Sequence, residues 1–80
     1  MRKYYFIKCV EKSRENDFMI INKYGFYWTN DIMEATKYNT LKECLHTIEY
    51  LYNNYAYFDF VIKPIQISIN PKIHIDRGEL

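Results

Sequence analysis

The sequence predicts an α+β domain: a three- to four-stranded, mainly antiparallel sheet with one amphipathic helix on one face, in the order β-β-β-α-β. Three observations predict this class. β-Forming residues fill the N-terminal segment, a glycine-centred turn separates two short apolar runs, and a later stretch repeats its apolar residues with helical spacing before an isoleucine-rich segment. Because the chain has 80 residues, of which 49% are hydrophobic, it forms at most one domain and has enough apolar material to fold.

The first half of the chain contains three predicted strands. The run KYYFIKCVEK is rich in β-forming residues on both faces, which indicates an inner strand over 3–11. After the polar loop SREND, the pattern predicts two short strands over 17–22 and 25–29. Gly25 supplies the positive φ that the tight hairpin between these two strands requires.

Two helix-capping patterns follow the hairpin. Asp31 and Glu34 have the spacing of a capping box and predict a single helical turn over 32–35, followed by a brief return to extended chain. Thr40 and Glu43 form a second box, which opens a helix over 41–53. The apolar face of this helix comprises Leu41, Cys44, Leu45, Ile48, Leu51, Tyr52 and Tyr55.

The C-terminal third changes its alternation at a proline. Over 57–63 the large apolar residues Phe58, Phe60 and Ile62 alternate with other residues, as in a half-buried strand. At Pro64 the phase of this alternation changes, which marks a bulge, a bend or a strand boundary. Beyond the proline, every second residue or so is isoleucine: Ile65, Ile67, Ile69, Ile73 and Ile75.

The length of this isoleucine-bearing segment has a consequence for its folding. Fully extended, residues 57–75 would span about 60 Å at roughly 3.3 Å per residue, whereas a chain of this size has a radius of gyration of about 12 Å. The segment therefore either folds back at Asn70-Pro71 or protrudes. We expect one domain over 1–70, with 71–80 as a tail or an extra edge strand. An isoleucine-bearing edge would be a template for self-association or for a partner strand; the alternative is an intramolecular hairpin or disorder of the last ten residues.

The composition limits the kinds of binding partner and the cellular compartment that we expect for this protein. Eleven basic residues against ten acidic ones, without a basic stripe, do not indicate a protein that binds nucleic acid through its charge. Two cysteines without a disulfide framework or a secretion signal indicate reduced thiols in the cytoplasm, and no run has the length of a membrane span. The bias toward Ile, Asn, Lys and Tyr is typical of AT-rich codons, and so of a low-GC bacterium or its phage.

Little in the sequence points to catalysis, and we expect no enzymatic activity, no cofactor and no metal. Cys44 and His46 would be half of a zinc site, but no second closely spaced pair completes it. As a nucleophile and base they would point in different directions from a helix, and Cys44 falls within the apolar stripe. Two glycines are too few for a phosphate-binding loop. Capping accounts for Asp31 and Glu34 without an acid–base role.

Aromatic residues are the better candidates for a contact surface. In the hairpin, Phe26 and Trp28 share one face of a strand, so if they point inward Tyr27 and Tyr24 remain exposed. Tyr50 lies off the apolar stripe of the helix. Because Tyr is common at interface hot spots, we expect partner contacts at Tyr24, Tyr27, Tyr50, Ile65, Ile67, Ile69, Ile73 and Ile75.

The stretch FMIINKYGFYWTNDIMEATKYNTLKEC resembles a pattern in small proteins of phages and prophages of low-GC bacteria. In that pattern an extended segment ends in a glycine and an aromatic pair, followed by a Thr-x-Asp turn, an Ala-Thr-x-aromatic step and a Thr-capped helix. The matching residues are Gly25, Tyr27, Trp28, Thr29, Asp31, Ala35, Thr36, Tyr38 and Thr40. The resemblance covers about a third of the chain. It implies a β-β-α-β arrangement and a non-enzymatic accessory role, with inhibitors of host machinery, including anti-CRISPR proteins, as one class.

The expected function is therefore that of a protein-binding module of phage or mobile-element origin that inhibits a host protein complex by occupying a surface. A homo-oligomer would form through the C-terminal strand. The alternative is a nucleic-acid-binding accessory protein that uses sheet aromatics together with Arg2, Lys3, Lys12 and Arg14. A third hypothesis is a small-ligand pocket at a dimer interface.

Overall fold

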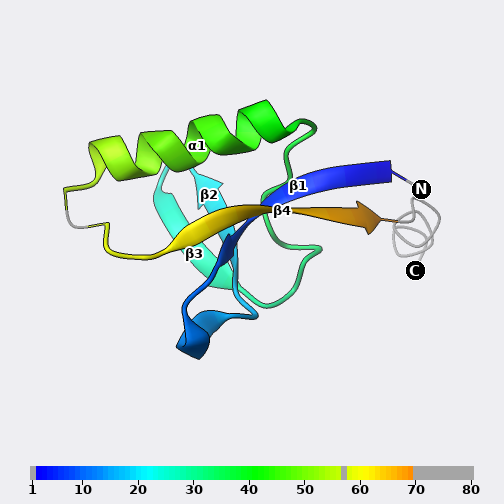
Figure 1. Ribbon diagram of the computed structural model, residues 1–80, viewed down its shortest axis with the longest axis horizontal. Helices are drawn as coiled ribbons and strands as arrows, with labels where there is room; N and C mark the ends of the chain where they lie inside the picture. The colour runs from blue at the N-terminus through cyan, green and yellow to red at the C-terminus, as the bar shows by residue number, and fades with distance from the viewer. Residues whose placement is uncertain (1, 57, 70–80) are drawn as a thin grey trace.

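The computed structural model describes residues 2–56 and 58–69, which form one four-stranded sheet and one helix (Figure 1). The elements are β1 (Arg2–Cys9), a 3₁₀ turn (Lys12–Arg14), β2 (Phe18–Asn22), β3 (Gly25–Thr29), α1 (Leu41–Asn54) and β4 (Ile62–Ile69). The sheet has the order β3-β2-β1-β4, and every neighbouring pair is antiparallel. The predicted α+β class, the order of its elements and the inner position of the first strand are confirmed.

The helix begins where the capping pattern predicts. The Thr40 hydroxyl accepts a hydrogen bond from the Glu43 N–H at 3.2 Å, and the Glu43 carboxylate accepts one from the Asn39 N–H at 3.3 Å. Both interactions satisfy N–H groups that have no partner within the helix. At the other end, the Tyr55 N–H donates to the Leu51 carbonyl, which closes the last turn.

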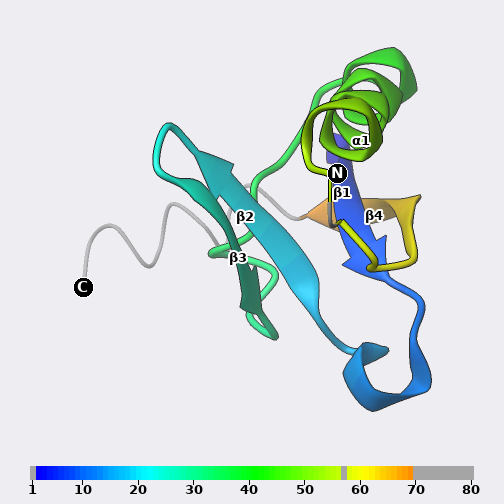
Figure 2. The same ribbon diagram turned by 90° about the vertical axis from the view of Figure 1, so that its left-hand side faces the viewer.

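The main core lies between α1 and the sheet. Figure 2 shows the helix above β1 and β4, and the helix packs against these two strands. The buried cluster comprises Ile7, Met19, Cys44, Ile48, Leu51 and Ile62. Only the centre of the predicted helical stripe is buried, because the helix covers a narrow pair of strands. Four of its predicted members remain exposed: Leu41, Leu45, Tyr52 and Tyr55.

The sheet is split between β1 and β2. The two strands share a single register pair, Lys8 with Phe18, and Figure 2 shows the β2–β3 hairpin diverging from the other two strands. The chain that connects β3 to α1 occupies the gap. On one side, Tyr38 exchanges two backbone hydrogen bonds of 2.8 Å with Tyr5 of β1.

On the other side of the gap, Thr36 replaces a strand partner for β2. Its N–H donates to the Met19 carbonyl at 3.1 Å. Its hydroxyl accepts from the Ile21 N–H at 2.8 Å and donates to the Ile21 carbonyl at 3.3 Å. We call residues 36–38 the wedge. The wedge satisfies backbone groups that would otherwise be left without partners where the two strands separate.

The turns around the hairpin correspond partly to the prediction. Gly25 has φ of 132° and is the one positive-φ residue of the described ranges, as the hairpin requires. The helical turn predicted after Asp31 is a hydrogen-bonded turn instead. There the Asp31 carboxylate accepts from the Met33 N–H at 2.9 Å, while the Glu34 carboxylate binds the Thr29 hydroxyl and not the backbone of Asp31. The carboxylate of Glu34 is thus not available to complete a capping box.

The strand predicted over 57–63 is wrong for residues 58–61, which are not in a strand. β4 starts at Ile62 and continues through Pro64 in unbroken register with β1. The change of phase is therefore neither a bulge nor a boundary. The strand instead turns its apolar side from the helix at Ile62 to the opposite face from Ile65 onward. The predicted turn at Asn70-Pro71 and the tail over 71–80 lie outside the described residues.

Candidate interaction surfaces and an aromatic pocket

The hydrogen bonds of β1 determine which backbone groups of β4 lie on its outer edge. Tyr5 directs both its N–H and its C=O toward the wedge. In an antiparallel ladder these directions alternate, so the residue opposite Tyr5, Gln66, also directs its backbone groups away from β1. The same holds at every second residue, and the Ile62 N–H accordingly reaches the Tyr52 hydroxyl at 3.2 Å. The outer edge of β4 therefore carries the backbone groups of Ile62, Pro64, Gln66 and Ser68.

The two halves of the outer edge of β4 differ in how well they are protected against pairing with another strand. Pro64 places its missing N–H on the outer side, where no bond to β1 is lost, and its neighbour Lys63 is exposed. Proline and lysine are common devices against unwanted strand pairing. From Gln66 to Ser68 the edge has neither device, and within the described residues β4 pairs with β1 alone.

The isoleucines of β4 lie on the face of the sheet away from α1. Ile65, Ile67 and Ile69 are half-buried and stand opposite Phe6, Tyr4 and Arg2 of β1. Phe6 is fully buried, lies outside the cluster beneath the helix and contacts the ring of Phe18 edge-to-face. The predicted strip is thus an apolar sheet face next to the open edge. Its remaining members, Ile73 and Ile75, lie outside the described residues.

The three tyrosines predicted as contacts are all exposed but do not form one surface. Tyr24, in the hairpin turn, is 77% exposed and its ring lies 5.1 Å from the Lys23 ammonium. Tyr27 is opposite Ile20, on the face of β3 away from the core residue Trp28. Tyr50 lies on α1, which covers the other face of the sheet. Their role in binding remains a prediction.

Both cysteine side chains lie inside the fold. Cys9 and Cys44 are free and buried, and burial raises the pKa of the Cys44 thiol to about 11. A thiol that stays protonated at neutral pH is a poor nucleophile and a poor metal ligand. Cys44 Sγ lies 3.6 Å from the Phe6 carbonyl oxygen, inside the core. His46 is exposed on the helix, and no three potential metal ligands cluster within 2–56 and 58–69.

The basic residues of the nucleic-acid hypothesis are not brought together. Arg2 and Lys3 open β1, whereas Lys12 and Arg14 follow its other end, so the length of an eight-residue strand separates the two pairs. At roughly 3.3 Å per residue this length is about 26 Å. Arg14 is also engaged, because its guanidinium binds the Asp17 carboxylate at 3.3 Å.

In the described part of the chain, no helix has the length and apolarity needed to cross a membrane.

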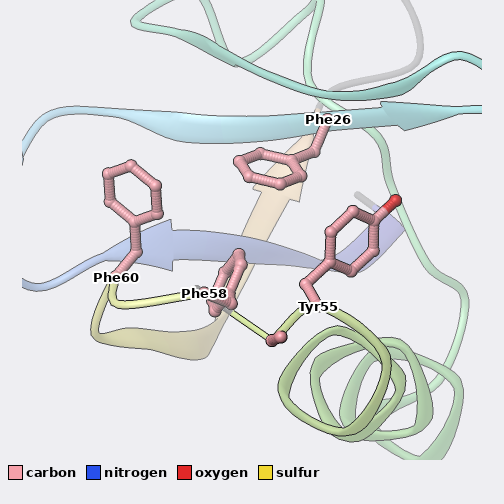
Figure 3. Close-up of a pocket in the computed structure, with 5 residues that line it drawn as sticks. Phe26, Tyr55, Phe58 and Phe60 are labelled. Carbon is pink, nitrogen blue, oxygen red and sulfur yellow. The ribbon is translucent and has the colours of Figure 1, made fainter.

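An aromatic pocket lies between β3 and the connection from α1 to β4. Figure 3 shows its rings facing a shared space, and its volume is about 200 Å³. Phe26 is the centre of the cluster, with its ring centroid 5.3 Å from that of Phe58, 5.7 Å from Tyr55 and 6.1 Å from Phe60. All three contacts are edge-to-face, the favourable arrangement for aromatic quadrupoles. The pocket is lined by Phe26, Tyr55, Ala56, Phe58 and Phe60.

The connection that forms one wall of this pocket is held by a side chain. The Tyr52 hydroxyl donates to the Phe60 carbonyl at 3.0 Å and accepts from the Ile62 N–H at 3.2 Å. The sequence pattern placed Phe58 and Phe60 in a strand and so did not predict the pocket. One signal was present: four of the six residues over 55–60, directly after the helix, are Phe or Tyr, which is a larger aromatic density than one strand face needs.

No protein-family model matches the chain, and neither a curated protein nor a solved structure matches it.

Proposed function

We propose that the chain is a non-enzymatic protein-binding module that inhibits a host complex by occupying a surface, and that it pairs with its partner through β4. The observation that carries the proposal is the open edge from Gln66 to Ser68, whose outward backbone groups have no strand partner in the described residues. The phage or mobile-element origin rests on the sequence resemblance and on the residue bias.

Two features support this edge over the other end of the sheet. β3, the opposite edge strand, is five residues long, whereas β4 has eight residues. The open half of β4 also borders the half-buried Ile65, Ile67 and Ile69, so a strand added there would gain apolar contacts on the face away from α1. Each main-chain hydrogen bond would contribute about 0.5–1.5 kcal/mol net, and the isoleucines would add specificity.

A matched pair of variants tests the proposal. Ser68→Pro removes an outward N–H and leaves the bonds to β1 intact, since Ser68 has the same parity as Pro64. Ser68→Ala keeps the N–H and serves as the control. Tagged wild-type protein and both variants are incubated with a lysate of a low-GC bacterium, and the captured proteins are identified by mass spectrometry. We expect a specific partner with wild type and Ser68→Ala and its loss with Ser68→Pro.

Two results would contradict the proposal: retention of the same partner by Ser68→Pro, or absence of any specific partner from all three samples. Light scattering of each purified protein is measured in parallel. If the wild-type protein is a dimer and Ser68→Pro is a monomer, the edge of β4 serves self-association. This result would correspond to the homo-oligomer that we expect to form through the C-terminal strand.

A further inference from the structure

The aromatic pocket is open to solvent and has no part in the interaction through β4. It is formed by rings from β3, from the end of α1 and from the connection to β4, and it is lined almost entirely by carbon. A volume of about 200 Å³ exceeds the roughly 150 Å³ of an apolar cavity that binds benzene. The space therefore has the size of a single ring or of two fused rings.

The charges around the pocket exclude most ionic ligands. Among the described residues that line it, no side chain is acidic or basic, and the nearby Arg14 guanidinium is already paired with the Asp17 carboxylate at 3.3 Å. The face of Phe60 already carries a cation, because the Arg14 guanidinium lies 5.7 Å from its ring centroid. This positive charge disfavours a second cation at the same ring. The aromatic cluster is therefore unsuited to ammonium ligands.

The backbone around the pocket presents few polar partners. The Tyr55 N–H donates to the Leu51 carbonyl and the Phe58 N–H to the Tyr55 carbonyl, both at 3.1 Å. The Phe60 carbonyl accepts from Tyr52. Among the described lining residues, the Tyr55 hydroxyl is then the one polar side-chain group. A ligand with several hydrogen-bonding groups would lose bonds to water there without replacing them.

We propose that this pocket binds a small, uncharged aromatic molecule of one or two fused rings. Such a molecule would enter edge-to-face contacts with Phe26 and Phe58, continuing the geometry that these rings already have with each other. One polar atom on the ligand, such as an indole N–H, would find the Tyr55 hydroxyl. The site is independent of the proposed binding at β4, and either would stand without the other.

The test is an NMR titration of ¹⁵N-labelled protein with indole as the probe. We expect saturable shifts at the amides of the lining residues. Ala56→Leu, at an exposed position on the pocket wall, would place a larger side chain in the space and weaken indole binding about tenfold or more. Phe58→Ala, which removes one ring, would do the same. Tyr24→Ala, an exposed aromatic of the hairpin turn, is the control and would leave the affinity unchanged.

Parallel titrations define the ligand class. Tryptamine, which adds an ammonium group, is expected to bind about tenfold more weakly than indole or not at all. Binding of N-acetyltryptophanamide without binding of indole would overturn the proposal in favour of a peptide side chain. Absence of saturation with indole, shifts spread away from the pocket, or unchanged affinity in a folded Ala56→Leu variant would each overturn it as well. Dispersed amide signals establish that each variant is folded.

Discussion

Thr36→Val removes the hydroxyl of the wedge and keeps the shape of the side chain. In the wild-type protein this hydroxyl binds both backbone groups of Ile21, accepting at 2.8 Å and donating at 3.3 Å. Valine preserves the methyl group and the β-branch but leaves the Ile21 N–H and C=O without these partners. The substitution therefore isolates the hydrogen bonding of the wedge from its packing.

The expected loss follows from these two bonds. A protein hydrogen bond contributes about 0.5–1.5 kcal/mol net, so the free energy of unfolding should fall by about 1–3 kcal/mol. For a domain of this size, each kcal/mol shifts Tm by roughly 4–8 °C. Thr47→Val is the matched control, because the Thr47 hydroxyl makes one long bond of 3.4 Å to the Glu43 carbonyl on an exposed part of the helix. Its expected loss is below about 0.5 kcal/mol.

Urea denaturation followed by circular dichroism measures both variants. If the wedge holds the two halves of the sheet together, Thr36→Val should be clearly less stable than Thr47→Val, and the two variants should have the same m value. Equal midpoints for the two variants would refute the account of the wedge. A lower m value for Thr36→Val alone would show that its native state has opened, and would place the damage in the gap between β1 and β2.

Two further predictions concern the core. Leu51→Ala creates a cavity at a fully buried position and should cost about 2–5 kcal/mol, whereas Leu45→Ala, at a position 45% exposed on the same helix, should cost less than about 1 kcal/mol; similar urea midpoints would contradict the assigned burial. Burial raises the pKa of the Cys44 thiol from 9.0 to about 11, so between these pH values the native state holds a proton that the unfolded state has lost. The free energy of unfolding should therefore fall by about 2–3 kcal/mol as the pH rises from about 9 to 11, and Cys44→Ala should lack this part of the decrease; identical pH profiles would refute it.

The helix could be predicted because its signals are local. Thr40 and Glu43 lie three residues apart, and the buried Cys44, Ile48 and Leu51 repeat at helical spacing. The hairpin likewise depends on neighbours, with Gly25 at its turn. These elements are determined by interactions within a few residues, which a single sequence displays directly.

The remaining features depend on contacts between distant segments. From the sequence alone, Pro64 appeared to interrupt a strand. β4 can contain a proline at this position because the missing N–H lies on the outer edge of the strand. Which edge is the outer one follows only from the pairing with β1. The pocket brings together Phe26 and Phe58, which are separated in the sequence by the whole of α1 and its flanking loops. The pattern before the helix predicted only a brief return to extended chain, and nothing local indicated that Thr36 would serve as a partner for β2.

The wedge also has a consequence for how the sheet assembles. The β2–β3 hairpin joins residues that are close in sequence, whereas β1 pairs with β4 across 53 residues at Cys9–Ile62 and 67 at Arg2–Ile69. The hairpin can form in microseconds, but the distant pairing must wait for a long loop to close. Since the wedge contacts Ile21 on one side and Tyr5 on the other, we expect the Tyr38 amide to gain protection from hydrogen exchange only when both ladders are in place.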